Sequence, residues 1–559
     1  MIRYLLFAIL AWGLVSCYED KGNYTYHDIN EVSVDSLNSF YTIDQFDTLK
    51  IDPVIAGTQY SDTARFNYAW EIDGKVVSSS ALLRYKVMNS PGEKYCRLII
   101  EDKDTKVKEY YYFHTNVVST TAVDGIMLLS NYKNHAELSF KRVDRETAPF
   151  QVNFYNDMNK TWLGTVPQKM IQVFNYELND DNDLYGLQIL TDNQIRRVSY
   201  KTLLEDEIHP IYNKDYFKSI IPVSPGYPDF GNFHTENLSS SVLTWMGDFM
   251  GPFQRIVYNS FISNGKFFMI MQSPVAGGVA DMSYLRESEL GGKLSPVYFN
   301  VSMKKNGQFS SFFYDIGYTI SDNMITYDQD NYRFLYGNYR SKSTFKEIQE
   351  LSTLNLEGYE PVFGSPTRNL NNPVVVISNG STYRCLVFQA PQNDNEYQPG
   401  QTTGIKFKII NDLTVPTGLM NKYSDFYCYI TDEDFYFSTD GTLYSVNIQS
   451  LINGSWSAKP ICQLTDFGYD AEAKINCFDI TRSGKYLVLG VSTDGKRKDE
   501  SSDELNGDVL LLNLEKNNNT ITLKNKFEQV GGTPTDIILK YLNYFCEGFD
   551  ENKTFRDYL

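Results

Sequence analysis

Residues 434–446 read DFYFSTDGTLYSV, and residues 483–490 read SGKYLVLG. In each stretch, short runs of aromatic or aliphatic side chains lie beside a tight turn, Asp-Gly in the first and Ser-Gly in the second. This pattern predicts β-hairpins. In a β-propeller, each blade is a small sheet built from two hairpins, and the neighbouring blades cover its apolar faces. The two stretches therefore predict a β-propeller.

The same theme of a short apolar strand beside a polar turn returns along the chain, at residues 125–131, 183–190, 264–271 and 331–337. Dividing roughly 425 residues into blades of about 40 to 50 residues, with long insertions, allows six to eight blades. We expect seven. The alternative is a pair of β-sandwiches, which would not need hairpins recurring so far along the chain.

Composition supports an all-β chain. The sequence holds 42 tyrosines and 35 phenylalanines, mostly in short alternating runs broken by Asn, Asp and Gly. Such runs are typical of strands and turns. Sustained helical periodicity is scarce, and short helices are expected only at residues 201–207 and 345–351.

The N-terminus carries a targeting signal. Arg3 precedes an apolar stretch over residues 4–14, which is too short to span a bilayer but suits a secretory signal peptide. Residues 14–17 read LVSC and resemble a bacterial lipobox. The resemblance implies a signal peptide over residues 1–16 and a mature chain that begins at a lipidated Cys17. The alternative is an ordinary signal peptide with a chance cysteine.

The residues that follow the cysteine refine the location. Residues 18–20 read YED and resemble the signal that exports Bacteroidetes lipoproteins to the outer face of the outer membrane. We therefore expect residues 17–28 to be a lipid-anchored linker, with the protein on the outer membrane and facing the cell exterior.

A first domain is expected over residues 29–120. Residues 68–74 read YAWEIDG, a half-buried strand that enters an Asp-Gly turn, and residues 91–102 form a turn followed by a long strand. Together they resemble the PKD version of the immunoglobulin-like sandwich, which places Trp70 in the core. Residues 121–559 are left for the propeller-like domain.

The opening CYEDKGNYTY of residues 17–26, the sandwich and residues 125–140 together resemble the PKD-like family of Bacteroidetes lipoproteins. The resemblance implies an accessory surface lipoprotein of a TonB-dependent nutrient importer, with SusC-like and SusD-like partners. Such a protein would bind oligopeptides or glycans outside the cell. It implies no reaction.

The net charge bears on the possible binding partners, and the spacing of the cysteines bears on the presence of disulfides. A formal net charge of −18 argues against nucleic acid or anionic lipid as a partner. Besides Cys17, six cysteines are widely spaced and none forms a C-x-x-C pair. Buried free thiols are expected rather than a disulfide framework.

No common catalytic signature is present. The five histidines form neither H-E-x-x-H nor a zinc spacing, and the G-x-S-x-G and P-loop motifs are missing from the sequence. We therefore predict a protein that is not an enzyme. The alternatives are a propeller-fold hydrolase that acts on extracellular glycan, for which two well-placed carboxylates suffice, and a purely structural importer subunit.

Two acidic clusters are candidate calcium sites. Residues 181–183 read DND, but Tyr185 stands where a third oxygen ligand is wanted. Asp503, Asn506 and Asp508 form the second cluster. Both are interpreted as solvated loops, so no cofactor or metal is expected.

Three tryptophans are candidates for ligand binding. Trp162 and Trp245 lie near glycines in loop-like sequence, and Trp456 follows an Asn-Gly-Ser turn. Indole rings stack on sugars and also dock peptides. The sequence does not choose between the two ligands, although the lack of tryptophan rows favours peptide.

Overall fold

The computed structural model divides the chain into two compact units. Residues up to Val118, apart from residues 88–91, form the first, and residues 88–91 together with the chain from Ser119 form the second. The sequence places this boundary at Thr120. The structure describes residues 29–174, 184–199, 202–205, 211–220, 234–245, 254–272, 284–287, 293–300, 303–305, 308–310, 323–338, 345–367, 372–389, 407–428, 433–481, 483–515 and 520–541.

The first unit is a β-sandwich. Its main sheet has the order β2-β9-β8-β5-β6, and the smaller sheets pair β3 with β7 and β1 with β4. These strands are β1 (Val32–Asp35), β2 (Phe40–Asp44), β3 (Thr48–Ile51), β4 (Val54–Gly57), β5 (Phe66–Ile72), β6 (Lys75–Ser78), β7 (Leu83–Lys86), β8 (Gly92–Asp102) and β9 (Lys108–Val118).

Trp70 is fully buried in the sandwich core, as the sequence predicts. Its ring meets Phe113 edge-on, with centroids 6.0 Å apart. Its indole N–H donates to the carbonyl of Ser80 at 2.9 Å, which satisfies the polar atom of a buried ring. Trp70 is therefore a structural residue.

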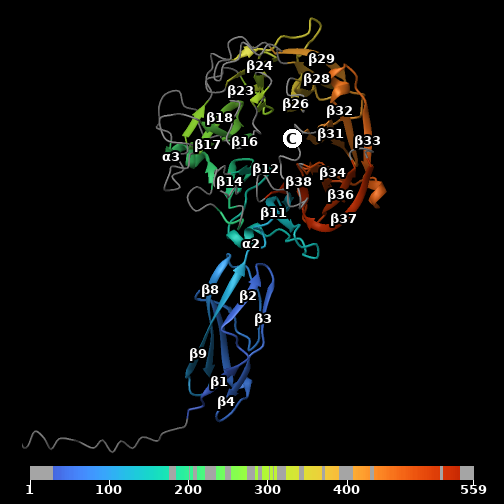
Figure 1. Ribbon diagram of the computed structural model, residues 1–559. Helices are drawn as coiled ribbons and strands as arrows, with labels where there is room; N and C mark the ends of the chain where they lie inside the picture. The colour runs from blue at the N-terminus through green and yellow to red at the C-terminus, as the bar shows by residue number, and fades with distance from the viewer. Residues whose placement is uncertain are drawn as a thin grey trace, which may run out of the picture. The chain divides into compact units, whose positions relative to one another are not determined.

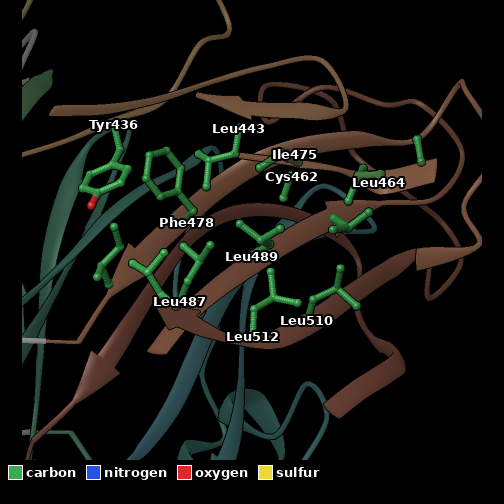
Figure 2. Close-up of a cluster of buried hydrophobic side chains, with 14 residues drawn as sticks. Tyr436, Leu443, Cys462, Leu464, Ile475, Phe478, Leu487, Leu489, Leu510 and Leu512 are labelled. Carbon is green, nitrogen blue, oxygen red and sulfur yellow. The ribbon is translucent and has the colours of Figure 1, made fainter. Parts of the chain in front are cut away.

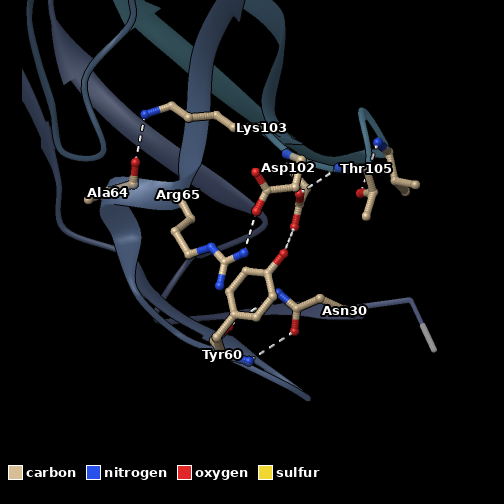
Figure 3. A network of polar contacts seen from close by, with 9 residues as sticks. Asn30, Tyr60, Ala64, Arg65, Asp102, Lys103 and Thr105 are labelled. Carbon is tan, nitrogen blue, oxygen red and sulfur yellow. Dashed lines mark hydrogen bonds and ion pairs between the residues drawn. The ribbon is translucent and has the colours of Figure 1, made fainter. Parts of the chain in front are cut away.

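A polar network ties the turn after β8 to an earlier loop (Figure 3). The Asp102 carboxylate accepts hydrogen bonds from the Tyr60 hydroxyl and from the backbone N–H of Asp104 and Thr105. The Tyr60 hydroxyl and the backbone N–H groups lower the pKa of Asp102 to about 2. Arg65 lies over the Tyr60 ring, with 3.7 Å between the guanidinium carbon and the ring centroid. These hydrogen bonds fix the conformation of the turn between β8 and β9.

The second unit is a seven-bladed β-propeller, counted over the described ranges (Figure 1). Six blades are four-stranded sheets in sequence order. The first blade comprises β12 (Pro167–Phe174), β13 (Leu184–Thr191), β14 (Gln194–Val198) and β15 (Ile211–Asn213), and the second comprises β16 (Thr235–Trp245), β17 (Gln254–Ser263), β18 (Lys266–Gln272) and β19 (Tyr284–Glu287). The third blade comprises β20 (Phe299–Asn300), β23 (Asn323–Asp328), β24 (Arg333–Asn338) and β25 (Lys346–Glu347), and the fourth comprises β26 (Glu360–Ser365), β27 (Val374–Ser378), β28 (Tyr383–Gln389) and β29 (Lys408–Thr414). The fifth blade comprises β30 (Phe426–Tyr427), β31 (Asp434–Thr439), β32 (Thr442–Asn447) and β33 (Ala458–Gln463), and the sixth comprises β34 (Lys474–Ile480), β35 (Tyr486–Ser492), β36 (Gly507–Glu515) and β37 (Thr520–Gly531).

The seventh blade closes the ring with strands from both ends of the unit. β38 (Thr533–Lys540) pairs antiparallel with β10 (Gly125–Tyr132), which pairs with β11 (His135–Arg142). β38 also contacts β34 on one side and β12 on the other, so it is the innermost strand of its blade. The buried Lys540 ammonium donates to the carbonyls of Thr121 and Val123 at 2.7 and 2.9 Å, which fixes the chain that enters the ring.

The quoted hairpins form as predicted. β31 and β32 pair around Asp440 and Gly441, and Asp440 adopts φ +51°, a left-handed value that suits a two-residue hairpin turn. The turn that contains Gly484, at φ +66°, joins β34 to β35.

Apolar layers between blades hold the ring together. Figure 2 shows the layer between the fifth and sixth blades, where Leu443 and Tyr436 of β32 and β31 meet Leu487 and Leu489 of β35. Burial of this surface is the main source of blade-to-blade stability.

The predicted helices were wrong. Residues 346–347 form β25, the outer strand of the third blade, because pairing with β24 outweighs weak helical propensity. Of residues 201–207, the described part, 202–205, holds a turn and a bridge from Glu205 to Val198. The described helices are α2 (Tyr155–Asn159), α3 (Lys214–Ile220) and α4 (Ile448–Ile452), with short 3-10 turns at η1 (Thr63–Arg65) and η5 (Leu464–Phe467).

Candidate functional site

The predicted site residues lie in different environments. Cys17 lies outside the described residues. Trp245 ends β16, and its side chain is likewise outside what the structure describes. Trp456 is half-buried and packs against the apolar layer between the fourth and fifth blades, 6.2 Å from Phe437. Trp162 is exposed over 47% of its surface.

Blade topology defines one face of the ring. Each blade is an antiparallel meander that starts at its innermost strand, so the turns between second and third strands all point to the same side. We call this side the turn face. It carries residues 133–134, 192–193, 264–265, 329–332, 379–382, 440–441 and 493–506.

The longest of these turns, residues 493–506 of the sixth blade, reaches both neighbouring blades. Arg497 forms an ion pair with Asp440 of the fifth blade. On the other side, Ser501 Oγ accepts a hydrogen bond of 2.7 Å from the backbone N–H of Asn134 in the closing blade. The loop is therefore braced on the turn face.

Four charged side chains gather where the inner strands meet this loop, and we call them the inner-wall cluster: Lys169 of β12, Asp425 just before β30, Lys498 of the loop and Asp536 of β38. Lys498 Nζ lies 4.0 Å from Asp425 Oδ1, and Lys169 lowers the pKa of both acids. The side chains of Asp425 and Lys498 remain 29% and 32% exposed. The cluster is therefore enclosed by protein and still reached by solvent.

Burial dominates the electrostatics of the two acids. Burial raises the pKa of Asp425, and burial together with the like charge of Asp425 raises the pKa of Asp536 to about 7. An ionised carboxylate held in such surroundings gains from a nearby cation. The pair is therefore suited to bind a cationic group.

Hydrogen bonds between neighbouring inner strands fix the carboxylates. Asp425 Oδ2 accepts from the backbone N–H of Phe478 at 3.2 Å, and Asp536 Oδ2 accepts from that of Met170 at 2.6 Å. Asp479 makes the corresponding bond to the N–H of Leu539 at 2.9 Å. The same kind of carboxylate-to-backbone hydrogen bond thus joins the blades at three successive junctions, and it leaves the acids little freedom to move.

Trp162 lies on the link between the closing blade and the first blade. Its ring stacks on His135, with centroids 4.0 Å apart and planes at 12°. The indole is therefore held in one orientation at the edge of the turn face.

The two acidic clusters are interpreted from the sequence as solvated loops, and for the second cluster this is wrong in part, because Asn506 and Asp508 are buried. Asp508 is buried and accepts hydrogen bonds from the Tyr469 hydroxyl at 2.9 Å and the Gln529 N–H at 2.8 Å. Residues 181–183 lie outside the described residues. Where side chains are described, no group of three or more His, Cys, Asp or Glu residues could hold a metal ion.

A comparison with protein families bears on the first unit. Residues 17–167 match the model of the PKD-like family. The N-terminal sandwich is PKD-like. A search of curated proteins found no match. No helix within the described part of the chain is long and apolar enough to cross a membrane.

Solved structures resemble the chain only distantly. A quinonprotein alcohol dehydrogenase-like protein from Bacteroides thetaiotaomicron has a TM-score of 0.49 at 10% identity, covering 91% of this chain and 99% of that one. A putative 6-phosphogluconolactonase from Bacteroides uniformis has a TM-score of 0.38 at 12% identity, covering 74% and 99%. The Nup133 β-propeller domain of Vanderwaltozyma polyspora has a TM-score of 0.27 at 8% identity, covering 72% and 89%. None of these likenesses bears on activity.

The inner-wall cluster was not predicted from the sequence. Its members come from four separate strands or loops of the first, fifth, sixth and seventh blades, and none lies in a recognisable motif. The one local signal is a lone acid, Asp536, inside the apolar run of an inner strand.

Proposed function

We propose that this protein is a lipoprotein tethered through Cys17 to the outer face of the outer membrane, where it binds oligopeptides as an accessory subunit of a SusC/SusD-type importer. The anchor rests on the lipobox at residues 14–17 and the acidic residues 19 and 20. The proposal includes no chemical reaction.

The inner-wall cluster is the observation that supports an oligopeptide as the ligand. A free oligopeptide is a zwitterion, with an ammonium group at one end and a carboxylate at the other. Asp425 and Asp536 would take the ammonium group, and Lys169 and Lys498 the carboxylate or backbone carbonyls. A neutral glycan carries no charged group to pair with either the two acids or the two lysines.

Calorimetric titration of the purified chain with pentaalanine tests the ligand class. We expect pentaalanine with free ends to bind, and N-acetylated pentaalanine to bind about tenfold more weakly or worse because the cationic end is lost. The double variant Asp425→Asn/Asp536→Asn should lose the preference for the free amine. Asp499→Asn, an exposed acid on the same loop as Lys498, is the matched control and should keep it. Equal affinity for the two peptides would contradict the proposal.

A face of the sandwich supports the partner part of the proposal. Tyr95, Tyr110 and Tyr112 project from adjacent strands β8 and β9 and are 72%, 44% and 69% exposed. Arg97 lies among them and pairs with Glu71 at 2.6 Å. Tyrosine and arginine with internally paired charge are typical of protein interfaces.

Co-purification tests this contact. The wild-type chain should be recovered with its SusC-like and SusD-like partners from detergent-solubilised outer membranes. The variant Tyr95→Ser/Tyr112→Ser should lose the partners while keeping its affinity for pentaalanine. Recovery of both partners with this variant would exclude the tyrosine face as the contact.

Location is tested on intact cells. Protease added outside should degrade the wild-type chain, and a Cys17→Ala variant should lose palmitate labelling. Protection of the wild-type chain would place it in the periplasm and remove the importer role.

One observation favours a second candidate, a propeller-fold hydrolase that acts on glycan. An acid whose pKa is raised to about 7, as that of Asp536 is, suits a general acid at neutral pH. Incubation with mixed oligosaccharides decides this candidate: product formed by the wild type and abolished by Asp536→Asn would establish an enzyme.

A further inference from the structure

Trp162 presents one open ring face to solvent. Its 12° stack on His135 at 4.0 Å covers the other face, and 47% of the residue stays exposed. A half-exposed indole whose one face is already packed offers a flat apolar surface of about one ring.

The backbone beneath the ring is fixed on both sides. Arg196 Nη2 donates to the carbonyl of Trp162 at 2.9 Å, and Gln194 Nε2 donates to the carbonyl of Leu163 at 2.9 Å. The backbone N–H of Ala136 donates to the carbonyl of Gly164 at 2.9 Å. The segment is thus pinned to β14 of the first blade and to β11 of the closing blade, so the ring is held ready for a ligand.

Gly164 makes this anchoring possible. Its φ of +135° lies outside the range that side chains favour, and a Cβ there would lie 2.7 Å from Thr191 Oγ1. The close approach to β13 therefore requires glycine, and it sets where Trp162 stands.

Two charged side chains close to Trp162 in the chain or bonded to it already have partners. Arg196 also pairs with Glu205 at 2.6 Å, and the Lys160 ammonium donates to the carbonyl of Asp157. A sugar needs free hydrogen-bonding groups around a stacking ring, whereas an aromatic side chain needs only the ring face.

The platform and the inner-wall cluster lie within reach of one ligand. Trp162 and Lys169 are seven residues apart in the chain, so their Cα atoms are at most about 25 Å apart. An extended peptide of about seven residues covers that distance.

We propose that Trp162, stacked on His135, is a subsite for an aromatic side chain of the bound oligopeptide. This inference rests on the proposed peptide-binding function and adds a preference to it: the cluster holds the charged end, and the indole selects peptides that carry Phe, Tyr or Trp further along.

Calorimetry with heptaalanine and with a set of heptapeptides in which each alanine from the second to the seventh is replaced in turn by Phe provides the test. For at least one position we expect the Phe peptide to bind the wild type about threefold to tenfold more tightly. Trp162→Ala should abolish that gain, so that the Phe peptide binds this variant no more tightly than heptaalanine does, while Trp162→Phe should keep part of the gain.

Tyr332→Ala is the matched control. Tyr332 is also an aromatic residue on the turn face, 42% exposed, in the turn between β23 and β24. This variant should keep the full gain, and thermal unfolding of all variants should show an intact fold.

The outcomes separate the two proposals. A wild type that binds heptaalanine and every Phe peptide equally overturns the subsite alone. A Trp162→Ala variant that keeps the gain in affinity would also overturn the subsite alone. Failure to bind any of the peptides overturns the proposed function together with the subsite. Tight binding of a neutral oligosaccharide that Trp162→Ala removes would assign the platform to sugar and overturn the aromatic preference.

Discussion

The carboxylate of Asp536 accepts a hydrogen bond of 2.6 Å from the backbone N–H of Met170. Asp536 belongs to β38, the last described strand, and Met170 to β12, the first strand of the first blade. The bond therefore lies at the junction where the ring closes. Because burial raises the pKa of Asp536 to about 7, we expect the stability of this junction to depend on pH near neutrality.

Asp536→Asn should reveal this pH dependence. The folded pKa of about 7 lies above the unfolded value of about 3.9, so folding takes up a proton and this contribution to the free energy of unfolding falls as pH rises from about 4 to about 7. Asparagine keeps an acceptor for the Met170 N–H and does not titrate. The unfolding temperature of the variant relative to the wild type should therefore rise by several degrees between pH 5 and pH 8, measured by scanning calorimetry. Parallel pH profiles for the two proteins would contradict this.

Asp102 should act in the opposite sense in the sandwich. Its folded pKa of about 2 lies below the unfolded value, so it stabilises the fold above about pH 4, and this contribution is lost as pH falls from about 4 to about 2. Tyr60→Phe removes the largest cause of the lowered pKa and should lower the stability of the sandwich at pH 7. Hydrogen exchange of β8 and β9 amides should be faster in the variant at pH 7, with the difference shrinking near pH 2. Tyr68→Phe, which removes a hydroxyl bonded only to the Thr63 carbonyl at 3.1 Å, is the control.

Much of the fold could be predicted because hairpins are local. The Asp-Gly turn at residues 440–441 and the aromatic runs beside it fix the pairing of β31 with β32, since turn geometry sets register. Ring closure is different: Gly125 pairs with Lys540 across most of the chain. No pattern near either residue encodes that partner, and only burial of the common core selects it.

The site was harder to predict than the fold for the same reason. Trp162 stood out because tryptophan beside glycine is a local signal, and the structure does place it on the surface. The same signal at Trp456 marked a ring that packs in an apolar layer. The inner-wall acids Asp425 and Asp536 meet only after the seven blades have closed, so no spacing in the sequence brings them together.

Two leucines of the sixth blade test the inter-blade layer. Leu489 is fully buried in the layer of Figure 2, whereas Leu523 on β37 is 42% exposed. Leu489→Ala should lower the free energy of unfolding by about 2–5 kcal/mol because it leaves a cavity between blades. Leu523→Ala should change it by less than about 1 kcal/mol. Urea unfolding followed by circular dichroism measures both, and similar losses would mean that the layer does not carry the stability assigned to it.

Thiol reactivity should follow burial. The five described cysteines form no disulfide, and four of them are buried while Cys428 is half-buried. Burial raises the pKa of Cys385 and of Cys462 to about 12, so at pH 8 almost none of either is thiolate, the form that iodoacetamide alkylates. Among the five described cysteines of the native protein, Cys428 should therefore be alkylated first, as judged by mass spectrometry of tryptic peptides. In denaturant all five should react at similar rates, which serves as the control. Alkylation of native Cys385 as fast as Cys428 would show that the fourth blade opens on the timescale of labelling, and would contradict a closed ring in which every blade is packed on both sides.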